Sequence, residues 1–204
     1  MRATANRAAP AAPNRYYDPH LGCDSVKLQP GEFFATDRDV AIVTVLGSCV
    51  AACLRDRETG IGGMNHFMLP RERDEADPAS VRARYGVHAM ELLINDLVRL
   101  GARRRNLEAK VFGGGNVLSG VTALNVGRAN ALFVAEFLRE ESIPVLAEDL
   151  EGTVSRKVYF FPASGRVLVR GIERNHNQTI VEREALYVQR LRELPAGGSL
   201  ELFT

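Results

Sequence analysis

The sequence predicts an α/β (α+β) fold: a single layered domain with a mixed β-sheet or β-sandwich core, flanked by two to three helices. Short β-branched apolar runs of strand length are interleaved with amphipathic segments that have helical spacing. These segments do not follow the steady strand–helix–strand rhythm of a doubly wound parallel sheet. With 204 residues, 46% hydrophobic and 25% charged, the chain has the size and composition of one ordinary soluble globular domain.

Charge and cysteine content narrow the classes of function. The formal net charge is +1, so no long-range field favours nucleic acid or an anionic membrane as a partner. The three cysteines form an odd number, which suits a reducing compartment better than a disulfide framework. No apolar run approaches the ~20 residues of a membrane span, and the N-terminus lacks the hydrophobic region of a secretory signal. We therefore expect a cytoplasmic protein that does not insert into membranes.

The chain divides into three parts. Residues 1–15 are mostly Ala, Pro, Asn and Arg, which predicts a flexible tail. Residues 16–180 carry the apolar periodicity and form the predicted domain. Residues 181–204 form a C-terminal extension that is predicted to be helical until Pro195 and the glycine pair that follows it.

The predicted elements follow from local patterns. The run DVAIVTVL at 39–46 predicts a buried strand, and residues 50–54 predict a second strand. DRETG at 56–60 predicts a turn, residues 61–69 a returning strand, and the charged segment after it a loop. The remaining pattern predicts helices at 87–100, 128–140 and 182–194, a strand ending in a glycine loop at 107–116, a strand at 143–147, and a hairpin of 157–161 with 166–170.

The segments LGSCVAAC and GIGGMNHFMLP place a cysteine and a histidine on the two arms of this first hairpin. A turn centred between Arg57 and Glu58 would pair Cys49 directly with His66, with Cβ atoms ~4.5–5.5 Å apart. A bulge at Gly60 would shift the register. The prediction is therefore proximity of the two side chains rather than direct contact.

A thiol near an imidazole has a chemical use. The thiolate is the nucleophile, and a neighbouring imidazolium favours the charged form and can donate a proton to a leaving amine. The small residues Gly47 and Ser48 leave room for a substrate carbonyl and leave backbone N–H groups free to face an oxyanion. One such donor contributes ~2.7–4 kcal/mol in the transition state.

Two alternatives stay open from the residues alone. A cysteine among small residues is more often a packed core residue, and this interpretation is preferred for Cys53. Zinc held by Cys49, Cys53 and His66 would lack a fourth ligand and a recognised spacing, so no metal site is predicted. The other three histidines lie beside the tail, in the first turn of a predicted helix and in a polar loop, which favours His66.

With these segments in view, the sequence resembles the chemoreceptor glutamine deamidase family, CheD. The specific part of the likeness is the pair LGSCVAACL and GGMNHFMLP, in which the cysteine and histidine are seventeen positions apart. The likeness covers residues 39–170 and includes EAKVFGGGN, VGRAN, and LAEDLEG followed by GRVLVR. The tail and the part beyond about Thr179 depart from the compact family pattern and look like additions.

The resemblance implies roles for particular residues. Cys49 would be the nucleophile, His66 the general base and acid, and Thr44 the third member of the catalytic set. The glycine loop at 113–116 and the VGRAN segment at 127–130 would line the site, and the alternatives are a tight turn and a helix cap, respectively. The substrate-binding residues implied are Gly47, Ser48, Asn65, Gly114 and Asn116.

The implied activity is hydrolysis of glutamine side-chain amides in methyl-accepting chemotaxis receptors, through a cysteine thioester, with release of ammonia. Such an enzyme is a cysteine-dependent protein-glutamine glutaminase, a hydrolase of signal transduction that needs no cofactor. The implied partners are the cytoplasmic domain of chemoreceptors and a CheC-type phosphatase. The alternative function is a non-catalytic adaptor that binds chemoreceptors or such a phosphatase.

Overall fold

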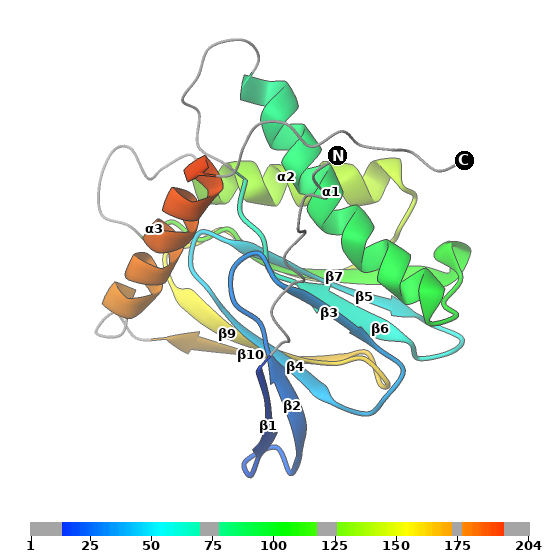
Figure 1. Ribbon diagram of the computed structural model, residues 1–204. Helices are drawn as coiled ribbons and strands as arrows, with labels where there is room; N and C mark the ends of the chain where they lie inside the picture. Colours follow the sequence, from blue (N-terminus) through cyan, green and yellow to red (C-terminus); the bar gives the residue numbers. More distant parts are fainter. Residues whose placement is uncertain (1–13, 70–77, 118–125, 173–176, 194–204) are drawn as a thin grey trace, which may run out of the picture.

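The computed structural model describes residues 14–69, 78–117, 126–172 and 177–193, and it consists of two five-stranded sheets with helices around them (Figure 1). The first sheet contains, in spatial order, β1 (Asn14–Asp18), β2 (Cys23–Lys27), β4 (Ala41–Leu46), β9 (Ser155–Phe161) and β10 (Arg166–Ile172). The second sheet contains, in spatial order, β3 (Phe33–Thr36), β6 (Gly62–Asn65), β5 (Val50–Asp56), β7 (Leu107–Gly113) and β8 (Val145–Leu150). The helices are α1 (Pro78–Arg99), α2 (Val126–Glu140) and α3 (Asn177–Glu193), with one 3-10 turn, η1, at Arg104–Asn106.

Both sheets are mixed. The pairs β2/β4 and β7/β8 are parallel, and the other neighbouring strands are antiparallel. The predicted fold class, a layered α/β (α+β) domain with mixed sheets and two to three helices, is confirmed.

Strand β5 lies in the middle of the layers and is buried on both faces. Ala51 and Cys53 face an apolar cluster shared with the first sheet, which also holds Ile42 and Phe160. The alternate positions of β5 face a second cluster that includes residues of α1 and α2, and these two helices cover the outer face of the second sheet (Figure 1). A strand that is covered on both faces has a continuous apolar sequence, and this explains the segment VAACL. Burying one large apolar side chain contributes about 1.5–3 kcal/mol, so these two clusters account for the cohesion of the layers.

The chain changes sheets between β4 and β5. Strand β4 belongs to the first sheet and β5 to the second, and Gly47, Ser48 and Cys49 make the whole connection. Helix α3 lies across this end of the sandwich (Figure 1). The segment with the candidate nucleophile is therefore a short crossover between two rigid sheets, covered by the C-terminal helix.

Most predicted elements are confirmed, with corrected boundaries. Helix α1 begins at Pro78, inside the segment predicted to be a charged loop, because proline is favoured in the first turn of a helix. The predicted hairpin of β9 and β10 is confirmed, with Phe161 paired to Arg166 across its turn. The hairpin of β1 and β2 was not predicted, since its strands are polar and short.

The two chain ends were predicted as a flexible tail and a helical extension. Most of the tail, residues 1–13, lies outside the described residues, and β1 starts at its last two positions. The extension is helical as far as Glu193, and its helix starts at Asn177, five residues earlier than predicted. In the part of the chain that the structure describes, no helix is long and apolar enough to cross a membrane.

Candidate active site

Three consecutive backbone N–H groups converge on one point at the sheet crossover. The N–H groups of Gly47 and Cys49 donate to Oε1 of Glu184, at 3.0 and 3.2 Å, and the N–H of Ser48 donates to its Oε2 at 3.1 Å. The hydroxyl of Ser48 donates to Oε2 at 2.6 Å. These donors form an anion-binding site, which we call the crossover site, directly at the Cys49 backbone.

The carbonyl groups of the same three residues are held on the other side. The carbonyls of Cys49 and Gly47 accept hydrogen bonds from the N–H groups of Gly114 and Gly115, at 2.7 and 2.8 Å. The carbonyl of Ser48 accepts a bond from Nδ2 of Asn130 at 2.8 Å. With all three carbonyls engaged elsewhere, the N–H groups are fixed in the direction of the crossover site before any ligand arrives.

The glycine loop after β7 has a steric reason to contain glycine. Gly113 has φ +109°, and a Cβ there would lie 2.2 Å from the carbonyl oxygen of Cys49. Gly114 has φ +65°, and its Cβ would lie 2.8 Å from the carbonyl oxygen of Gly127 in α2. Any larger residue would push this loop away from the crossover backbone.

Thr44 and His66 form a hydrogen-bonded pair between the two sheets. Thr44 Oγ1 lies 2.7 Å from Nδ1 of His66 and 3.0 Å from the carbonyl oxygen of Leu28. Because the only hydroxyl proton is donated to the carbonyl of Leu28, Oγ1 accepts from Nδ1–H of the imidazole. This bond fixes the tautomer with Nε2 unprotonated, so Nε2 is the basic nitrogen of the ring.

The register that would pair Cys49 directly with His66 is not observed, because the pairing of the two strands is shifted by two residues. Strands β5 and β6 pair Cys53 with Met64, and the bridge at the end of the ladder pairs Val50 with Phe67. The turn is centred one residue later than expected, because the carboxylate of Asp56 accepts hydrogen bonds from two N–H groups of the turn.

Proximity of the two side chains survives this correction. In the observed register Cys49 and His66 are diagonal neighbours on the face of the second sheet that meets the first sheet. Such neighbours have Cα atoms about 7–8 Å apart.

Burial dominates the acid–base properties of the pair. The exposed fraction is 0% for Cys49 and 2% for His66. Burial raises the pKa of the Cys49 thiol well above its usual range, and the Glu184 carboxylate raises it further by its charge and by a hydrogen bond with the thiol. Burial lowers the pKa of His66 to about 3, so the ring is neutral at physiological pH.

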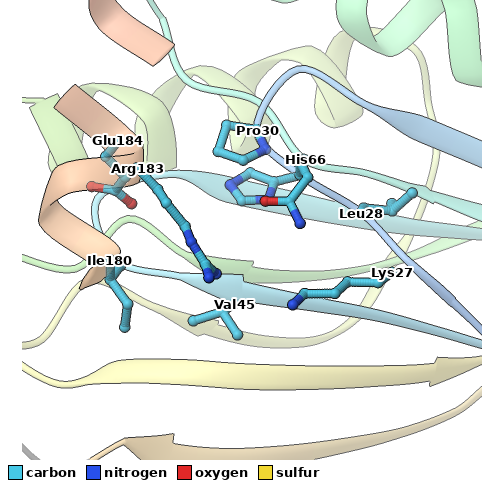
Figure 2. Close-up of a pocket in the computed structure, with 9 residues that line it drawn as sticks. Lys27, Leu28, Pro30, Val45, His66, Ile180, Arg183 and Glu184 are labelled. Atoms are coloured by element: carbon cyan, nitrogen blue, oxygen red, sulfur yellow. The ribbon is translucent and has the colours of Figure 1, made fainter. Parts of the chain in front are cut away.

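A small pocket lies beside the pair, and His66 is in its wall (Figure 2). Figure 2 shows Glu184 and Arg183 reaching into it from α3, and Lys27 entering from the first sheet. Cys49 is not in the pocket wall. Within the described ranges, Nε2 of His66 has no hydrogen-bond partner.

The structure separates the other predicted site residues. Asn65 points to the opposite face of the second sheet, where its side chain accepts from the N–H of Ala52 and donates to the carbonyl of Ala89. This placement gives no support to substrate contact by Asn65. Asn116 follows the glycine loop, and its Oδ1 is shielded from solvent without a partner among the described residues.

Asn130, from the VGRAN segment that was expected to line the site, bridges the carbonyl of Ser48 and the N–H of Leu69. Sequence reasoning missed one residue of the site, Glu184. Glu184 lies more than 130 positions from the crossover, and no local pattern could have linked the two. In the described ranges, no three His, Cys, Asp or Glu side chains are grouped to hold a metal ion.

Comparison with known proteins identifies the family. The family model described as CheD chemotactic sensory transduction matches residues 68–171. A probable chemoreceptor glutamine deamidase CheD of Methylobacillus flagellatus is 55% identical over 94% of this chain and 96% of its own length. Proteins with the same description from Thiobacillus denitrificans and Laribacter hongkongensis are 56% and 51% identical, over 94% and 98% of this chain and 96% and 98% of their own lengths.

These matches extend over most of the chain. A span of 94% leaves roughly 12 of 204 residues unmatched, so helix α3 falls within the aligned part of these relatives. Cys49 and His66 precede the segment matched by the family model, but the full-length relatives cover them. On this likeness, which spans nearly the whole of each chain, the protein belongs to the CheD family.

Proposed function

We propose that this protein is a cysteine-dependent glutamine deamidase that converts glutamine side chains of chemoreceptors to glutamate and releases ammonia. The observation that carries the proposal is the crossover site, in which the N–H groups of Gly47, Ser48 and Cys49 converge on one anion beside the nucleophile. Amide hydrolysis needs this feature most, because negative charge develops on the carbonyl oxygen in the transition state.

In the first half-reaction, Nε2 of His66 takes the proton of the Cys49 thiol. The thiolate attacks the carboxamide carbon of the substrate glutamine, and the crossover N–H groups receive the oxyanion. The imidazolium then donates its proton to the nitrogen as the C–N bond breaks, which releases ammonia and leaves a thioester. Thr44 accepts from Nδ1–H throughout and is therefore the positioning residue for the ring.

In the second half-reaction, His66 takes a proton from water, and the resulting hydroxide attacks the thioester carbon. Collapse of the second oxyanion breaks the C–S bond, and the thiolate recovers its proton from the imidazolium. The products are a glutamate side chain and ammonia, and the only co-reactant is water. No cofactor takes part in these steps.

Substrate binding is assigned to the crossover and the glycine loop. Gly47 and Ser48 hold the carbonyl oxygen, and Gly114 acts through the carbonyl of Cys49 that it fixes. Asn116 remains a candidate contact for the substrate amide, because its shielded Oδ1 lacks a partner in the described residues. An amide N–H₂ group is the complementary donor for this oxygen.

The substrates are assigned to chemoreceptors because the relatives are described as probable chemoreceptor glutamine deamidases. We place the reaction in the cytoplasm, where a free thiol is kept reduced, and all three cysteines of the chain are unpaired in the structure. A CheC-type phosphatase remains a proposed second partner.

The proposal is tested with a receptor cytoplasmic fragment as substrate. Mass spectrometry should detect conversion of glutamine to glutamate by the wild-type protein, with equimolar ammonia. Cys49→Ala should abolish the conversion, whereas Cys23→Ala, which removes a cysteine from strand β2, should not. Conversion by Cys49→Ala at the wild-type rate would exclude this mechanism. If neither protein converts the fragment but both bind it, the adaptor function replaces the enzyme.

A further inference from the structure

The C-terminal helix places a carboxylate where the mechanism needs the substrate. Glu184 has an exposed fraction of 4%, and its two oxygens accept from three backbone N–H groups and the Ser48 hydroxyl. Among the described residues, no cationic side chain forms an ion pair with it. The charge is therefore held by the same donors that the reaction assigns to the oxyanion.

A glutamate side chain is also the chemical product of deamidation. Its carboxylate has the shape of the substrate carboxamide, with oxygen in place of the amide nitrogen. Glu184 thus presents, from a helix, the product group inside the site that would form it.

One face of α3 makes the contacts. Ile180, Glu184 and Tyr187 are spaced four and three residues apart and point to the same side. Ile180 is buried in the pocket wall, and the hydroxyl of Tyr187 meets that of Tyr85 in α1. The Tyr187 ring lies against Gly31, where a Cβ would come within 2.6 Å of it.

Glu184 also interacts with the nucleophile itself. The Cys49 thiol interacts with the Glu184 carboxylate, while Nε2 of His66 lacks a partner in the described residues. The thiol is fully buried and outside the pocket wall. With α3 in place, the sulfur is shielded from solvent, so an external substrate amide has no access to it.

The same face contains a contact that opposes docking of α3. Arg183 and Lys27 enter the pocket from opposite sides (Figure 2). Burial lowers the pKa of Lys27, and the charge of Arg183 lowers it further. Like charges in one pocket weaken the attachment of α3.

We propose, resting on the function proposed above, that α3 occupies the groove for the receptor helix as a built-in product analogue, and that the substrate helix displaces it. The preferred substrate is then a helical glutamine with an apolar residue four positions before it and an aromatic or apolar residue three positions after it. This footprint copies Ile180, Glu184 and Tyr187.

The sharpest test converts the product analogue into a substrate. In Glu184→Gln, the side-chain amide of position 184 lies in the site, and Cys49 should hydrolyse it with water to a carboxylate and ammonia. Mass spectrometry of purified protein should find glutamate at position 184. The double variant Glu184→Gln/Cys49→Ala should keep the glutamine. Glu182→Gln, at an exposed position of the same helix, should keep its glutamine as well.

A second test measures access to the thiol. Glu184→Ala removes the blocking group, and its charge no longer suppresses the thiolate. Alkylation of Cys49 by iodoacetamide in the full-length protein should accelerate about tenfold or more, since one pKa unit changes the thiolate fraction tenfold. Glu182→Ala should alkylate at the wild-type rate. Conversion of a receptor fragment should also become faster in Glu184→Ala, because KM should fall when the competing side chain is removed.

The outcomes separate the two proposals. If the wild-type protein converts receptor glutamines but the amide introduced by Glu184→Gln stays intact and Glu184→Ala alkylates slowly, the displacement proposal falls and the deamidase remains. If Glu184→Ala loses receptor conversion, Glu184 is part of the catalytic machinery and the proposal is overturned. If the Glu184→Gln protein converts its own amide but no receptor fragment is converted, α3 does occupy the substrate groove, and the receptor is the wrong substrate.

Discussion

Replacing Thr44 by valine tests whether its hydroxyl positions the catalytic imidazole. Valine keeps the shape of threonine but cannot accept the bond from Nδ1–H of His66 or donate to the carbonyl of Leu28. The bond to the imidazole matters most when the ring is charged, during proton transfer. A hydrogen bond to a charged group contributes about 1.5–3 kcal/mol. This energy corresponds to a fall in kcat/KM of about 10- to 150-fold.

The assay is steady-state conversion of a receptor cytoplasmic fragment by Thr44→Val, with Thr44→Ser as the matched control. Serine restores the hydroxyl but not the methyl group, so it should recover activity to within a few-fold of wild type. The loss in Thr44→Val should lie in kcat, because Thr44 does not contact the crossover site. Full activity of Thr44→Val would refute the positioning role. Equal loss in both variants would show that the methyl group, which serine lacks, matters as much as the hydroxyl, which valine lacks.

Two further predictions concern the backbone and pH. Gly113→Ala should lower the free energy of unfolding by at least about 2 kcal/mol in chemical denaturation, because its Cβ would overlap the carbonyl oxygen of Cys49 at a positive φ. Gly171→Ala, whose Cβ would meet a side chain only at 3.5 Å, should change stability little, and equal losses would contradict the steric argument. The pKa of His66 is about 3 in the folded protein, so below about pH 6.5 the unfolded state alone takes up its proton. The free energy of unfolding should therefore fall as pH drops from about 6.5 towards 3, by about 1.4 kcal/mol per unit from this residue. His66→Asn should have a shallower slope, and an unchanged slope would rule out His66 as the source.

The strands were predictable where the sequence reports burial directly. The run of residues 39–46 is β-branched and apolar because β4 is central in its sheet, with β2 and β9 on either side. The residues after Cys49 are small and apolar because β5 is covered on both faces. Such patterns record the layer in which a strand lies. They do not record which sheet it joins, so the crossover between sheets was not predicted.

The register error shows a second limit. Composition located a turn at residues 56–60, but its centre depends on the side chain of Asp56, which accepts from the N–H groups of Glu58 and Thr59. A polar turn with several possible hydrogen-bond patterns does not fix a register by itself. The role of Glu184 could not be predicted either, because it depends on packing between segments that are far apart in the chain.

The crossover site must satisfy two opposed demands. Its N–H groups stabilise an oxyanion, and the more firmly they do so, the more firmly they also bind the carboxylate that the reaction produces. Glu184 shows that this affinity is sufficient to keep a carboxylate buried without an ion pair among the described residues. A neutral glutamine amide keeps only the contacts that one oxygen accepts, such as those from the N–H groups of Gly47 and Cys49, but it avoids the cost of burying a charge. Substrate can therefore compete with the carboxylate of Glu184. The product carboxylate competes less well, because it must lose its hydration before it binds. Once α3 has returned, the product also finds the site occupied. The helix that blocks the site would then also drive release of the product.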